Sequence, residues 1–195
     1  MTLHHISSSN DWRIRLGRGA QAALSLIALL WCIFLLQVLF PGLIGWGLRP
    51  RSFEAPQGLV LAHVLHGGVA HLVANTVPLF FLSWLLWVWS PVLALRSLLF
   101  SAASASLITW VFAPAGSIHI GASGLVFGCF GIILVNGLFR RSLGWSALAV
   151  LVALLYGGGL AAGILAPDQG VSWAMHAGGF LGGAYAGWMW RDRQA

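Results

Sequence analysis

Polar side chains that could carry chemistry stand at three places in an otherwise strongly apolar sequence. These are His71 with Asn75 four residues later, the segment Gly121-Ala-Ser123-Gly124, and His176. A serine beside a histidine is the minimal pair for nucleophilic acyl transfer, because imidazole can take the hydroxyl proton and return it to the leaving amine. Imidazole, amide and backbone N–H donors could stabilise the oxyanion that develops. The residue types therefore predict a hydrolytic site, provided that the fold brings the three places together.

The composition says where such a site would lie. Of 195 residues, 59% are hydrophobic and only 14 are charged, ten arginines and four acidic residues, with no lysine. A soluble domain carries about 25% charged residues, against 7% here. So few charges cannot cover a soluble surface, so apolar residues must face lipid. The arginines are dispersed between apolar blocks rather than gathered on one face, which argues against nucleic-acid binding.

Six apolar blocks predict an all-α membrane protein with six spans, since one crossing needs about 20 apolar residues. The blocks are residues 20–46, 69–89, 92–113, 121–138, 145–166 and 172–190. We expect a short N-terminal tail (1–19), one six-span domain (20–190) and a short C-terminal tail (191–195). Ser90-Pro91 predicts a tight turn between the second and third spans. The stretch from Leu59 to Leu65 is too short to cross, and it predicts an interfacial or re-entrant segment.

The arginines predict the orientation of the chain in the membrane. With a cytoplasmic N-terminus, eight arginines lie inside and two, Arg49 and Arg51, lie outside. This bias agrees with the positive-inside rule and predicts that both termini are cytoplasmic. The second, fourth and sixth spans then run from outside to inside.

This topology brings the three polar places to one depth. His71, Ser123 and His176 each lie within about five residues of the outer end of an outside-to-inside span. Because a helix rises about 1.5 Å per residue, the three residues should lie at the same depth to within several Å. His176 shares a helical face with Gly179 and Gly183, and the fourth span offers glycines at 124 and 128. We therefore expect the fourth and sixth spans to pack closely and to place Ser123 beside His176.

The remaining titratable residues narrow the chemistry. The four acidic residues, Asp11, Glu54, Asp168 and Asp192, fall in tails or loops, which favours a Ser–His dyad over a triad and argues against an aspartyl protease. There is no H-E-x-x-H motif, and we expect neither a metal nor a cofactor. The other histidines read as structural: His66 is expected to hold the external loop by a hydrogen bond, and His63 and His119 to lie at the membrane interface.

Read in order, the motifs resemble those of the rhomboid intramembrane serine proteases of the bacterial six-span type. They are His71-x-x-x-Asn75, Gly121-x-Ser123-Gly124 and His176-x-x-Gly179-x-x-x-Gly183, over about residues 20–190. The resemblance implies Ser123 as nucleophile, His176 as general base, and His71 and Asn75 as oxyanion partners, with Gly121 and Gly124 shaping the serine turn. The sequence departs from the family at Gln57-Gly58, where many members have a Trp-Arg pair.

The resemblance further implies transmembrane proteins as substrates, cut near the outer leaflet. The expected setting is a lipid bilayer, as a multi-pass protein of the bacterial inner membrane. Two alternatives stay open: a non-proteolytic factor of the same fold that binds transmembrane helices, and a small-solute transporter. A transporter would be expected to carry mid-membrane charges or broken helices in related halves. The sequence shows neither feature.

Overall fold

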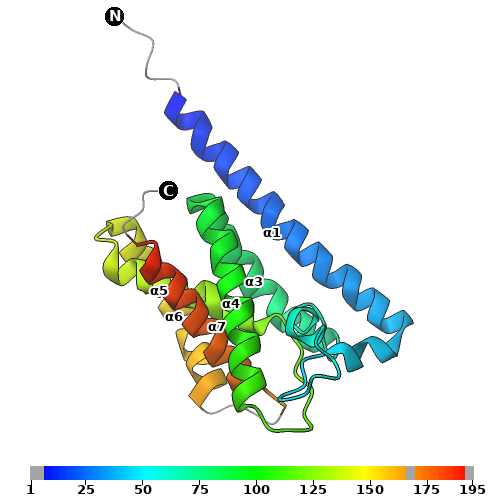
Figure 1. The fold of residues 1–195 in the computed structure, drawn as a ribbon. Helices are drawn as coiled ribbons and strands as arrows, with labels where there is room; N and C mark the ends of the chain where they lie inside the picture. The colour runs from blue at the N-terminus through cyan, green and yellow to red at the C-terminus, as the bar shows by residue number, and fades with distance from the viewer. Residues whose placement is uncertain (1–6, 166–169, 192–195) are drawn as a thin grey trace, which may run out of the picture.

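The computed structural model describes residues 7–165 and 170–191, with side chains from Asp11 on, and most of these residues are helical (Figure 1). The elements in chain order are α1 (Ser7–Leu39), the 3-10 helix η1 (Pro41–Trp46), α2 (Gly58–Leu61), α3 (Val69–Trp89), α4 (Pro91–Phe112), α5 (Ser123–Phe139), α6 (Leu143–Leu165) and α7 (Trp173–Met189). The all-α class is as predicted.

The long helices fall into two groups by length. Four of them, α1 from Asp11 on, α3, α4 and α6, are long and apolar enough to cross a membrane. Helices α5 and α7 have 17 residues each, about 26 Å at 1.5 Å per residue, slightly less than a hydrocarbon core of about 30 Å. These two helices carry Ser123 and His176.

Two boundaries of the first apolar block differ from the prediction. Helix α1 begins at Ser7, inside the predicted tail, and ends at Leu39 rather than near residue 46. Pro41 ends the helix because proline has no N–H to donate and its ring clashes with the preceding turn. The apolar residues that follow form η1 instead. Composition alone does not distinguish these two helices, since both are apolar.

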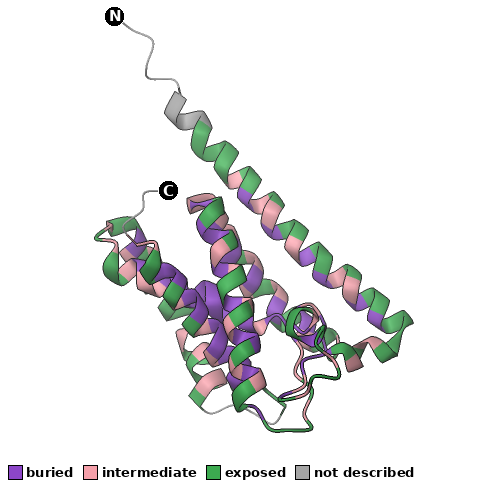
Figure 2. Cartoon of the chain, in the orientation of Figure 1, coloured by how far each residue is buried: buried purple, intermediate pink, exposed green. Residues whose placement is uncertain are grey.

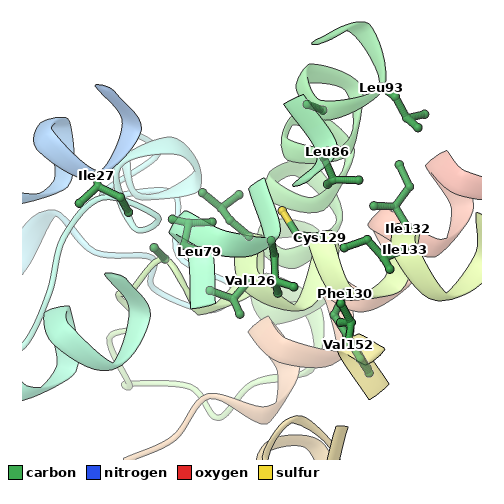
Figure 3. Close-up of a cluster of buried hydrophobic side chains, with 14 of the residues drawn as sticks. Ile27, Leu79, Leu86, Leu93, Val126, Cys129, Phe130, Ile132, Ile133 and Val152 are labelled. Carbon is green, nitrogen blue, oxygen red and sulfur yellow. The ribbon is translucent and has the colours of Figure 1, made fainter. Parts of the chain in front are cut away.

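Helix α5 lies at the centre of the bundle and contacts α3, α4, α6 and α7. Eleven of its 17 residues are buried, whereas α1 packs on α3 at the outside and exposes most of its surface (Figure 2). The core side chains come from several helices, among them Ile27 of α1, Leu79 and Leu86 of α3, and Cys129 of α5 (Figure 3). The large apolar side chains left exposed, many of them on α1, α4 and α6, are suited to lipid.

Glycines let α7 approach two neighbours at once. A Cβ at Gly179 would overlap the carbonyl oxygen of Gly124, and one at Gly183 would overlap the carbonyl oxygen of Gly128, both in α5. On the adjoining face, a Cβ at Gly182 would overlap the carbonyl oxygen of Phe100 in α4. Such small-residue contacts allow backbones to pack without intervening side chains. Helix α7 is thereby held between α4 and α5.

The Ser90-Pro91 turn is confirmed. Ser90 ends α3 and caps α4, its side chain accepting from the N–H of Leu93 at 3.3 Å. Pro91 occupies the first position of α4, where a missing N–H costs nothing.

The connection between η1 and α3 packs onto the ends of α4 and α5. Its backbone pairs with the segment before α5 through Leu48 and His119, with N···O distances of 3.0 and 2.9 Å. A Cβ at Gly58 would lie 2.5 Å from the carbonyl oxygen of Gly47, so this position requires glycine. The short helix α2 therefore folds back on the connection itself, and Gln57-Gly58 forms its start.

Candidate active site

Ser123 is the first residue of α5, and the turn before it is held from two sides. Gly121 has φ +126°, a conformation that side chains rarely adopt, and its N–H donates to the carbonyl of Ala62 at 2.8 Å. The N–H of Ala122 donates to Nε2 of His66 at 3.3 Å. Ser123 itself is half-buried. The serine therefore stands at a helix N-terminus whose entry is fixed by hydrogen bonds.

His66 holds the connection between η1 and α3, in line with the structural role expected for it. Its backbone N–H and C=O pair with the side chain of buried Gln37, at 3.0 and 3.1 Å. Burial lowers the pKa of His66 to about 4, helped by the nearby His71, so the ring is neutral and can accept the Ala122 N–H.

His71 and Asn75 face the serine turn from α3. A Cβ at Gly121 would lie 2.6 Å from Nε2 of His71, so the imidazole rests directly on the glycine. Asn75 is buried, and its amide nitrogen donates to the carbonyl of His71 at 3.1 Å. Glycine at 121 is thus required both by its backbone angle and by the imidazole.

His176 is buried on α7, and its ring is held on two sides. Nδ1 lies 2.9 Å from the carbonyl oxygen of Gly163 in α6, and the ring stacks on Phe127 with centroids 4.2 Å apart and planes 12° from parallel. A carbonyl only accepts, so the bonded Nδ1 carries the proton. In the neutral ring Nε2 is then the unprotonated nitrogen.

All four residues with predicted chemical roles line one cavity of about 740 Å³: His71, Asn75, Ser123 and His176. The cavity is walled by α3 and α6 and by residues 170–172 before α7. Among the described residues, no hydrogen bond joins Ser123 to His176. The two helix ends therefore bring the pair to a shared space without linking them directly.

Sequence reasoning missed two partners of His176. Phe127 lies one turn after Ser123, so helical periodicity could have placed it on the face of Ser123. The carbonyl of Gly163 left no signal in the sequence, because it is a backbone group. It belongs to the last turn of α6, where carbonyls lack an intrahelical partner and are open to side-chain donors.

His63 and His119 were expected at the membrane interface. In the structure, each of them contacts serine hydroxyls. His63 is buried, with Nε2 2.8 Å from the hydroxyl of Ser106, which donates to the carbonyl of Leu59 at 2.6 Å. Because that serine proton is already committed to a carbonyl, the pair serves to anchor α2 on α4. Half-buried His119 bonds to two serines, described below.

Compared with known protein families, residues 54–193 match the rhomboid domain. The chain belongs to the rhomboid family. Its relatives include the "Uncharacterized protein Rv1337" of Mycobacterium tuberculosis, 34% identical over 187 residues that cover 88% of this chain and 75% of the relative. The "Rhomboid protease GluP" of Bacillus subtilis is 31% identical over 163 residues, covering 74% of this chain and 28% of that protein. The "Putative rhomboid protease YdcA" of the same species is 34% identical over 93 residues, 44% of this chain and 43% of that protein.

Proposed function

We propose that the protein is an intramembrane serine endopeptidase in which Ser123 is the nucleophile and His176 the general base. The observation that carries the proposal is the hydrogen bond from His176 Nδ1 to the Gly163 carbonyl, beside a cavity that Ser123 also lines. This bond leaves Nε2 as the free base in that cavity. Family membership and the relatives named as rhomboid proteases support the same class of reaction.

In the proposed reaction, Ser123 Oγ attacks the scissile carbonyl carbon while Nε2 of His176 takes the hydroxyl proton. The tetrahedral intermediate collapses, the C–N bond breaks, and the imidazolium returns the proton to the leaving amine. Water then hydrolyses the acyl-enzyme by the same route. General-base help of this kind contributes about 10²–10⁴-fold in rate.

A backbone carbonyl takes the place that an aspartate holds in a triad. Asp11 and Glu54 are exposed and distant from the cavity lining, while Asp168 and Asp192 lie outside the described residues. The Gly163 carbonyl can fix the tautomer and orientation of His176 without a buried negative charge, which would be costly in a membrane.

The oxyanion would be stabilised from α3 and from the start of α5. The first N–H groups of a helix have no intrahelical partner, and those of Ser123 and Gly124 belong to this turn. His71 and Asn75 line the cavity from the opposite side. Removing one such donor typically costs about 10²–10³-fold in kcat.

The substrate is proposed to be a transmembrane segment of another protein, cut near the outer leaflet. The cavity lies between α3 and α6, which make little contact with each other in the described part of the chain. A Cβ at Gly158 or Gly159 of α6 would meet no atom within 4 Å, so no described neighbour packs on α6 at these positions. We propose that this part of α6 shifts to admit the substrate. The protein would be an integral protein of the bacterial plasma membrane, with six spans and both termini cytoplasmic.

The test is cleavage of a model transmembrane substrate by the purified full chain in proteoliposomes. The parent should release two fragments, and Ser123→Ala and His176→Ala should each reduce the rate at least 10³-fold. Either variant cutting as fast as the parent would refute the dyad. An intact parent that binds the substrate without cutting it would favour the non-proteolytic alternative, and solute flux in the same vesicles would favour a transporter.

A further inference from the structure

A serine–histidine contact away from the proposed dyad links the two segments that lead into α5 and α7. Nδ1 of His119 lies 2.7 Å from the hydroxyl of Ser172. His119 stands four residues before Ser123, and Ser172 stands four residues before His176. The contact therefore joins two positions that have the same sequence spacing from the proposed catalytic residues.

The donors and acceptors around His119 form one consistent chain. The hydroxyl of Ser117 donates to the carbonyl of Pro114 at 2.5 Å, so it accepts from Nε2–H of His119 at 2.8 Å. With Nε2 protonated, Nδ1 of the neutral ring accepts the hydroxyl proton of Ser172. Burial lowers the pKa of His119 and so favours this neutral form.

Each end of the contact is held by further hydrogen bonds, His119 to the connection before α3 and Ser172 to α7. The backbone of His119 is fixed by the paired hydrogen bonds with Leu48. Ser172 caps α7: its hydroxyl accepts from the N–H of Met175 at 3.3 Å, and its carbonyl accepts from the N–H of His176 at 3.1 Å. A displacement of His119 is thus passed to the first turn of α7, where His176 lies.

From this arrangement we infer that His119 and Ser172 are positioning residues, whose hydrogen bond sets the placement of His176 relative to Ser123. The inference rests on the proposed function. His119 does not line the cavity, so it acts through α7 rather than on the substrate. Ångström-scale misplacement of reacting groups can cost about 100-fold in rate.

The experiment compares kcat and KM of the purified full chain with His119→Ala, Ser172→Ala, the double variant and His119→Asn. We expect His119→Ala to lower kcat about tenfold or more and to leave KM within about twofold. KM is read on the His119 variants because Ser172 itself lines the cavity. His119→Asn should recover most of kcat, since its side-chain oxygen can accept from Ser172 near the position of Nδ1. The double variant should lose no more than Ser172→Ala, because both substitutions remove the same bond.

Ser172→Thr tests the hydroxyl itself, because threonine keeps the hydroxyl and the helix cap. Its kcat should exceed that of Ser172→Ala. The inference is overturned if His119→Ala keeps full kcat, if His119→Asn is as impaired as His119→Ala, or if the two alanine losses multiply in the double variant. If the parent is instead no faster than Ser123→Ala, the proposed function itself fails. The two failures are therefore distinguishable.

The tautomer of His119 gives a readout that does not depend on activity. Imidazole ¹⁵N chemical shifts in the full chain should show a protonated Nε2 and an unprotonated, hydrogen-bonded Nδ1 at neutral pH. Ser172→Ala should move the Nδ1 shift and leave that of Nε2 nearly unchanged. A parent with its proton on Nδ1 would contradict the inferred direction of the link.

Discussion

At the residue scale, the buried histidines of this protein differ in the groups that their ring nitrogens contact. The Ser106 hydroxyl next to His63 already donates to a backbone carbonyl, and its contact is an anchor. His176 instead gives Nδ1–H to the Gly163 carbonyl, which leaves Nε2 unprotonated in a residue that lines the cavity. A direct Ser–His hydrogen bond therefore does not by itself identify a catalytic pair, because the group to which the serine donates its proton must also be considered.

Replacement of Gly121 tests the turn that precedes Ser123. Gly121→Ala should reduce kcat more than 100-fold and lower stability by about 1–3 kcal/mol, because alanine would be strained at φ +126° and its Cβ would press on His71. Cleavage kinetics and thermal unfolding in detergent measure both effects.

Gly116 is the matched control, since it has φ +81° and open space around its Cβ position. Gly116→Ala should share the stability loss from backbone strain and retain activity. Equal activity losses in the two variants would show that contact with His71 is irrelevant.

Two buried histidines in the connection between η1 and α3 predict that stability depends on pH. Burial lowers the pKa of His63 and of His66 to about 4, from an ordinary value of 6.5. Between these values the unfolded chain takes up protons that the folded chain refuses, so stability falls as pH decreases from 6.5 to 4. The slope should be about 1 kcal/mol per pH unit for each histidine.

Unfolding of the protein in detergent at a series of pH values measures this slope. His63→Gln should make it shallower by removing one protonation site. A stability that stays flat or rises on acidification to pH 4.5 would contradict the assignment of neutral, buried rings.

At the scale of elements, α7 carries glycines on two faces, and each face packs closely against the backbone of another helix. Gly179 and Gly183 admit the backbone of α5, and Gly178 and Gly182 admit that of α4. Any side chain there must push helices apart, and a shift of α7 carries His176 with it.

Gly183→Ala should therefore destabilise the bundle by about 1–3 kcal/mol, the usual cost of overpacking. Gly158→Ala in α6 is the control, because its Cβ would meet nothing within 4 Å. Since alanine favours helix by about 1 kcal/mol over glycine, the control should be neutral or slightly stabilising. Unfolding in detergent compares them, and a Gly183→Ala variant as stable as Gly158→Ala would contradict the close approach.

The sequence predicted the helical class and named four residues that line one cavity in the structure, for physical reasons. The lengths of the apolar segments locate α3, α4 and α6. Glycines spaced four residues apart predict the contact between α5 and α7. The end of α1 was misplaced because the apolar block continues past Pro41 into η1. The hydrogen bond to the Gly163 carbonyl could not be predicted, because every residue has a backbone carbonyl and the sequence does not single one out. The partners His119 and Ser172 lie 53 residues apart in connections without periodicity.

At the scale of the whole molecule, arginines and tryptophans gather at one end of the bundle. Arg15 donates to the carbonyl of Trp89, Arg96 lies 4.6 Å from the ring centroid of Trp190, and Arg140 donates to the carbonyl of Arg191. Arg51 lies at the opposite end, where it donates to the carbonyls of Val111 and Ala113. This distribution supports the proposed orientation, with the arginine-rich end in the cytoplasm.

Single cysteines introduced at two exposed positions test this orientation, in a background lacking Cys32 and Cys129. A membrane-impermeant maleimide applied to intact spheroplasts should label Glu54→Cys, and should label Arg141→Cys only after permeabilisation. The reverse pattern would overturn the orientation and move the cavity to the cytoplasmic side.

The central claim is that His176 activates Ser123, and covalent labelling tests it most directly. A fluorophosphonate probe is added to the purified full chain, and the modified residue is located by mass spectrometry. We expect an adduct on Ser123, formed at least about 100-fold more slowly in His176→Ala. An adduct on Ser106 or Ser172 instead, or equally fast labelling of Ser123 in His176→Ala, would contradict it.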